Sequence, residues 1–108
     1  MTIVRSRAMA AALLALVALP TGAYAQDVAA GEHIAKTWCA GCHVVGSEVH
    51  KPANDAIPSF SSVAKMDSTT ATSLEVFLTT PHGRMPDYSL SRNEIRNVSA
   101  YILSLRGK

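Results

Sequence analysis

The two cysteines of this chain lie together in the pentapeptide Cys39-Ala40-Gly41-Cys42-His43. Thiols at this spacing are about one helical turn apart, so each can form a thioether with one of the two vinyl groups on one edge of a porphyrin. The histidine that follows directly can place a ring nitrogen on the iron. The motif therefore predicts covalent attachment of one haem c through Cys39 and Cys42, with His43 as an axial iron ligand.

Other kinds of site also use two cysteines at this spacing. A thiol–disulfide redox site has Cys-x-x-Cys at a helix start within a βαβ pattern, whereas the flanks here predict a helix before the motif and a loop after it. A structural zinc site needs four ligands, and His33, His50 and His82 are scattered along the chain. A structural disulfide would leave His43 without a role. Haem attachment is favoured because it accounts for the whole motif.

The first 25 residues have the three parts of a secretory signal peptide. Arg5 and Arg7 supply positive charge, an apolar stretch covers residues 8–19, and Ala23-Tyr24-Ala25 fits the small-x-small cleavage pattern. The alternative is an uncleaved membrane anchor, but this stretch is shorter than the ~20 apolar residues that span a bilayer. We therefore expect cleavage before Gln26, a mature domain over residues 26–108 without a membrane span, and a periplasmic location.

Export also changes the charge of the protein. The whole chain has a formal net charge of +2, but loss of Arg5 and Arg7 leaves eight basic and eight acidic residues. A neutral domain gives no support to nucleic-acid binding, which needs a basic patch. A protein-only core is marginal in a single domain of this size, so a covalently held haem fits the composition.

The pattern of the mature chain predicts several short helices and no strand of useful length. Asp27 is a suitable N-cap for a first helix that leads into the haem motif. The apolar face of this helix is expected to hold Val28, Gly31, Ala35 and Trp38, with Ile34 beside it. Residues 44–58 contain glycine, prolines and asparagine and therefore predict a loop.

Helices are also predicted in the second half of the chain. A short one is expected over residues 60–66, and a longer one over 68–80 that opens with a capping box from Thr72 to Glu75. A clear capping box from Ser91 to Glu94 opens the last helix. Its apolar face consists of Ile95, Val98, Ile102 and Leu105, with Tyr101 adjacent.

The chain combines four features in this order: a helix ending in Cys-x-x-Cys-His, a long loop, Met85-Pro86 and an amphipathic last helix. In this combination the chain resembles the class I c-type cytochromes, which are small monohaem proteins. The resemblance covers residues 26–108 and implies an all-α cytochrome c fold, with three to five short helices wrapped around one covalent haem. It also implies that the first and last helices cross where Gly31 meets Tyr101. Ala35 lies where the family usually has an aromatic residue.

The resemblance further implies the remaining residues of the haem site. The second axial ligand in this family is a methionine before the last helix, and Met85 is the match; Met66 is the other methionine of the mature chain. His82, in the same loop, is a competing ligand that would give bis-His ligation and a lower potential. Pro58 corresponds to the proline whose carbonyl accepts a hydrogen bond from the axial histidine His43.

The function implied is that of a periplasmic one-electron carrier, not an enzyme, which acts as a monomer and meets redox partner proteins transiently. A haem c subunit of a larger periplasmic oxidoreductase complex is an alternative. A gas-binding or catalytic haem protein with an open sixth site is another, and it requires that Met85 does not bind iron. Donor, acceptor and potential cannot be read from the sequence.

Overall fold

The computed structural model describes residues 26–47, 56–80 and 82–108, which form helices and connecting segments without a strand. Helix α1 (Val28–Ile34) continues into the π-helix η1 (Ala35–Cys39). The later elements are α2 (Phe60–Lys65), α3 (Ala71–Thr79), α4 (Arg92–Ser104) and the 3₁₀ helix η2 (Leu105–Gly107). The predicted all-α fold is confirmed for these residues. The signal peptide predicted over 1–25, His50 and the middle of the predicted loop over 44–58 lie outside them.

Side-chain capping sets where α1 and α4 begin. Asp27 caps α1 by accepting a hydrogen bond from the Ala30 amide at 2.9 Å, as predicted. The capping box of Ser91 and Glu94 at the start of α4 is also confirmed.

The capping box predicted for α3 was wrong in its position. The N-cap is Thr70, whose hydroxyl accepts from the Ser73 amide, while the Ser73 hydroxyl accepts from the Thr70 amide at 2.8 Å. A serine can take the part usually played by glutamate because its hydroxyl oxygen also accepts hydrogen bonds. Thr72 is therefore inside the first turn of the helix rather than before it.

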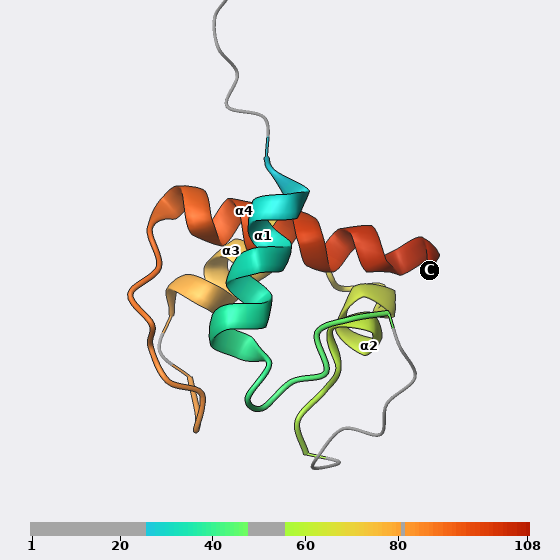
Figure 1. Cartoon of the computed structure of the whole chain (residues 1–108). Coiled ribbons are helices and arrows are strands. Elements are labelled where there is room, and N and C mark those ends of the chain that lie inside the picture. Colours follow the sequence, from blue (N-terminus) through green and yellow to red (C-terminus); the bar gives the residue numbers. More distant parts are fainter. Residues whose placement is uncertain (1–25, 48–55, 81) are drawn as a thin grey trace, which may run out of the picture.

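Helices α1 and α4 cross (Figure 1). Their backbones come into close contact at Gly31. A Cβ atom on Gly31 would lie 1.9 Å from the carbonyl oxygen of Asn97 and 3.0 Å from the Cβ atom of Tyr101. Only glycine leaves room for a backbone carbonyl at that distance. The contact between Gly31 and Tyr101 that the family resemblance implied is thus confirmed.

The buried face of the first helix agrees with the predicted one at Gly31, Ile34 and Ala35 and differs from it at Val28 and Trp38. Gly31, Ile34 and Ala35 are buried, whereas Val28 and Trp38 are 42% and 50% exposed. Val28 is the first residue of α1, and for Trp38 the reason is the change of helix type at Ala35, whose carbonyl accepts from the Ala40 amide, five residues ahead instead of four. The wider turn rotates the residues after Ala35 away from the positions that α-helical spacing predicts.

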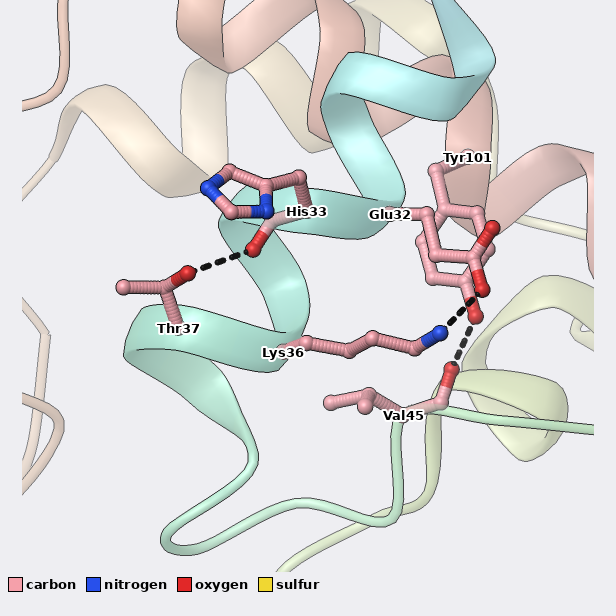
Figure 2. A network of polar contacts seen from close by, with 6 residues as sticks. All are labelled: Glu32, His33, Lys36, Thr37, Val45 and Tyr101. Atoms are coloured by element: carbon pink, nitrogen blue, oxygen red, sulfur yellow. Dashed lines mark hydrogen bonds and ion pairs between the residues drawn. The ribbon is translucent and has the colours of Figure 1, made fainter.

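Side chains of the C-terminal helices hold the connecting segments in place. Tyr101 is buried, and its hydroxyl donates to the carbonyl of Val45 at 2.6 Å (Figure 2). The Arg106 guanidinium donates to the carbonyls of Ala64 and Thr69, at 2.7 and 2.6 Å. These bonds fix the segment after the Cys-x-x-Cys-His motif and the segment after α2 against the last helix. Within the described ranges, no helix is long and apolar enough to cross a bilayer.

Candidate functional site

The Cys-x-x-Cys-His motif forms a tight turn at the end of η1. The carbonyl of Cys39 accepts hydrogen bonds from the amides of Cys42, at 3.1 Å, and His43, at 2.9 Å. Cys39 is buried and Cys42 is exposed, and both thiols are free of a disulfide. The turn therefore brings the predicted attachment thiols and His43 together within one short segment.

The surroundings of Cys39 do not match a thiol–disulfide redox site. Burial raises the pKa of the Cys39 thiol, whereas reactive cysteines of redox motifs have a lowered pKa at a helix N-terminus. Cys39 instead ends a helix, and the described residues contain no βαβ unit around it. A zinc site has no support either, since no group of three or more His, Cys, Asp and Glu residues is clustered in the parts of the chain that the structure describes.

His43 is held in one orientation by the chain around residues 58–60. Its Nδ1 atom lies 2.7 Å from the carbonyl oxygen of Pro58, and because a carbonyl only accepts, Nδ1 carries the proton. The phenyl ring of Phe60 lies 5.3 Å from the imidazole, and the Phe60 amide donates to the carbonyl of Val44. The hydrogen bond at Nδ1 therefore leaves Nε2 as the nitrogen that can bind a metal, as in a histidine ligand whose other nitrogen is hydrogen-bonded.

Met85 lies in the segment between α3 and α4, beside a shallow hollow. The hollow is lined by Leu78, Thr80, His82, Met85, Pro86, Asp87, Tyr88 and Leu90. The Met85 side chain is partly buried there, whereas Met66 at the end of α2 is half exposed and does not line the hollow. His82, the competing ligand, also lines it, with Nε2 3.2 Å from the Met85 sulfur.

The Met85 segment lies next to the chain that leads into the haem motif. The rings of Trp38, directly before Cys39, and Tyr88, three residues after Met85, are 5.6 Å apart. In Figure 1 the turn after η1 and the orange segment before α4 extend on the same side of the crossing of α1 and α4. The structure therefore brings together two motifs that are more than forty residues apart in the sequence.

The chemistry of these groups fits a covalent haem. The segment offers two free thiols one turn apart and an imidazole whose Nε2 is available to a metal, and a thioether lies on the neighbouring segment. Large apolar side chains of this region, those of Trp38, Phe77 and Tyr88, are 40–52% exposed. A flat apolar cofactor is the kind of group that such side chains contact.

A sequence family described as cytochrome c oxidase, cbb3-type, subunit III matches residues 26–102. The chain is a small bacterial c-type cytochrome. Its cofactor is the covalently bound haem c of this family.

Two curated relatives are similar over most of their length. Cytochrome c-552 from Bradyrhizobium diazoefficiens is 42% identical over 94 residues, which cover 87% of this chain and 89% of the relative. A cytochrome c6-like protein from Nostoc sp. (strain PCC 7120) is 34% identical over 83 residues, or 75% of this chain and 73% of the relative. No solved structure matches the chain. The relatives support a role for this cytochrome in electron transfer.

Sequence reasoning missed several residues that support the site. Gly31 packs against the backbone carbonyl of Asn97, and the side-chain oxygen of Asn97 accepts a hydrogen bond from the Asp27 amide at 2.9 Å. Arg106 donates hydrogen bonds to two backbone carbonyls, and the carbonyl of Val45 accepts one from the Tyr101 hydroxyl. Asn97 lies four residues before Tyr101 on the same face of α4, and this spacing could have indicated that Asn97 also contacts the first helix. No sequence pattern indicates which carbonyls the other two side chains reach.

Proposed function

We propose that this cytochrome is a periplasmic one-electron carrier, with haem c joined to Cys39 and Cys42 and iron bound by His43 and Met85. The observation that carries the proposal is the 2.7 Å contact between His43 Nδ1 and the carbonyl of Pro58. It orients the imidazole with Nε2 free, which is the arrangement of an axial ligand. The similarity to small cytochromes over most of their length supports the role of carrier.

Each residue has a defined part in this proposal. The haem supplies an iron that alternates between the ferrous and ferric states. His43 keeps its proton on Nδ1, which donates to the carbonyl of Pro58, so no proton has to move at this ring when the electron moves. The Met85 thioether raises the potential relative to a second histidine. Pro86 has a fixed φ angle and limits the motion of the backbone beside Met85. With both axial positions filled, the site excludes small-molecule chemistry.

Export is part of the proposal. Residues 1–25 act as a signal peptide that is cleaved before Gln26, and residues 26–108 form the cytochrome domain. The start of the family match at residue 26 supports this boundary. The measurement is the intact mass of the protein purified from the periplasmic fraction, expected to equal residues 26–108 plus one haem. A mass that still includes residues 1–25 would contradict cleavage.

The axial ligands can be tested with optical spectra of the oxidised and reduced protein and a pyridine haemochrome assay. Two thioethers, a low-spin iron and no carbon monoxide binding are expected. Met85→Ala should change the ferric spectrum and lower the potential, whereas the matched control Met66→Ala should leave both unchanged. Carbon monoxide binding to the unaltered reduced protein would favour the open-site alternative. An unchanged spectrum in Met85→Ala would exclude Met85 as a ligand.

A second candidate is a haem subunit of a larger periplasmic oxidoreductase complex. The observation in its favour is the family description, which names a subunit of an oxidase. The free carrier predicts a monomer, with only transient contact to redox partners. Native gel filtration of the periplasmic fraction, followed by haem staining, distinguishes the two. A single small species supports the carrier, and elution with a large assembly supports the subunit.

A further inference from the structure

His82 and His43 have the same hydrogen-bonding arrangement. In each ring, Nδ1 lies 2.7 Å from a backbone carbonyl oxygen, which belongs to Thr80 for His82 and to Pro58 for His43. A carbonyl only accepts, so Nδ1 of His82 carries the proton. The lone pair of the neutral ring is then on Nε2, which is the nitrogen that a histidine with a bonded Nδ1 offers to a metal.

The Nε2 atom of His82 is next to the sulfur of Met85. Nε2 is 3.2 Å from Sδ, and both residues line the hollow between α3 and α4. A thioether has no proton to donate, so in the neutral form of His82 the two atoms are neighbouring electron-pair donors. Two donor atoms this close together can be offered in turn to the same metal ion.

The chain holds His82 in this place. Gly83 has a φ of 51°, a left-handed conformation in which glycine has no steric cost, and it turns the backbone between His82 and Met85. The ring of Phe77, on α3, lies 3.6 Å from the imidazole centroid to centroid, with 36° between the planes. Contacts on three sides, from Thr80, Phe77 and Met85, therefore orient the ring toward the hollow.

We propose that His82 is a reserve axial ligand, which binds the haem iron through Nε2 whenever Met85 leaves it. The inference rests on the proposed His43/Met85 ligation. In the exchange one iron–sulfur bond breaks and one iron–nitrogen bond forms, with the electron pair supplied by Nε2. No electron is gained or lost, and the proton stays on Nδ1, which donates to the carbonyl of Thr80. The exchange keeps the iron six-coordinate and lowers its potential, since histidine replaces a thioether.

Four variants of the haem-loaded protein test this proposal: Met85→Ala, Met85→Ala with His82→Gln, Met85→Ala with His33→Gln, and His82→Gln alone. The third is a matched control, because His33 is exposed on α1 and is absent from the hollow. The readouts are the ferric spin state by electron paramagnetic resonance, the midpoint potential, and carbon monoxide binding to the ferrous form. Far-UV circular dichroism checks that each variant is folded, and His82→Ala is the second substitution if glutamine perturbs the loop.

We expect Met85→Ala to remain low-spin, with a lowered potential and no ready binding of carbon monoxide, and the His33 control to behave in the same way. Removing His82 as well should give a high-spin iron that binds carbon monoxide. His82→Gln alone should keep the spectrum of the unaltered protein.

The outcomes separate the two proposals. A high-spin Met85→Ala that binds carbon monoxide as the double variant does would overturn the reserve ligand and leave His43/Met85 ligation intact. A Met85→Ala protein with an unaltered spectrum, together with a changed spectrum in His82→Gln, would show that His82 is the resident ligand. That result would overturn both proposals.

Discussion

The crossing of α1 and α4 should not tolerate a single added methyl group at Gly31. In Gly31→Ala the new Cβ atom would lie 1.9 Å from the Asn97 carbonyl oxygen and 2.5 Å from its carbonyl carbon. These are backbone atoms of a helix, so no side-chain rotation can relieve the overlap. Ordinary contact begins at about 3.4 Å, and the two helices must therefore move apart by about 1.5 Å at this point.

The size of the effect follows from two opposing terms. Overpacking costs about 1–3 kcal/mol, and a clash with backbone belongs at the upper end of that range. Alanine recovers about 1 kcal/mol relative to glycine in a helix interior. The net loss is then about 2 kcal/mol, a large share of the roughly 4–12 kcal/mol expected for a domain of this length. At about 4–8 °C per kcal/mol, the Tm should fall by about 10 °C.

The assay is thermal unfolding of the haem-loaded protein, followed by far-UV circular dichroism. Gly107→Ala is the matched control, since a Cβ atom there has no neighbour within 4 Å. The control should change the stability by less than about 0.5 kcal/mol. Equal Tm values for the two variants would refute the argument that the approach of the helices requires glycine.

Three further predictions concern the C-terminal helices α4 and η2. Tyr101→Phe removes the donor to the buried Val45 carbonyl and should cost about 1–2 kcal/mol in a denaturant titration. A change within error of zero would show that water replaces the hydroxyl. Arg106→Ala removes two hydrogen bonds from a cation to carbonyls and should destabilise the protein by about 1–2 kcal/mol, with faster amide exchange in α2. Unchanged amide exchange would contradict the role of Arg106 in holding α2 and the segment after it. The backbone hydrogen bond with Ser91 lowers the pKa of Glu94. The stability that the Glu94 carboxylate contributes is therefore present above the ordinary glutamate pKa of about 4.3 and is lost as the pH falls through the lowered value. Glu94→Gln should therefore lose less stability than the unaltered protein between about pH 5 and 3, and identical acid titrations would contradict this.

Features that depend on residues close in sequence were predictable. The N-cap at Asp27 and the capping box of Ser91 and Glu94 are both decided within one helical turn, and the structure confirms them. The error at α3 shows the limit of this reasoning. Thr70 with Ser73 and Thr72 with Glu75 offer competing starts for one helix, and a difference of two residues is small in local free energy.

Features that depend on contact between distant segments were less predictable. The π-helix at Ala35–Cys39 could not be read from spacing, because α-helical and π-helical turns place the same apolar residues on different faces. Trp38 was therefore expected in the face that packs on α4 and is instead half exposed against Tyr88. The bond from His43 to Pro58 was expected only from the family resemblance, since nothing in the residues themselves selects that carbonyl.

The sequence by itself determined the attachment chemistry, the helical class and most helix starts, because each depends on groups within a few residues of one another. Cys39, Cys42 and His43 are neighbours on the chain, and their order specifies a covalent haem without any tertiary information. The tertiary structure decided which distant groups meet: Asn97 against Gly31, Tyr101 on Val45, and Trp38 beside Tyr88. Such contacts depend on how closely two backbones approach and how a loop turns, and no residue pattern within either segment records that geometry.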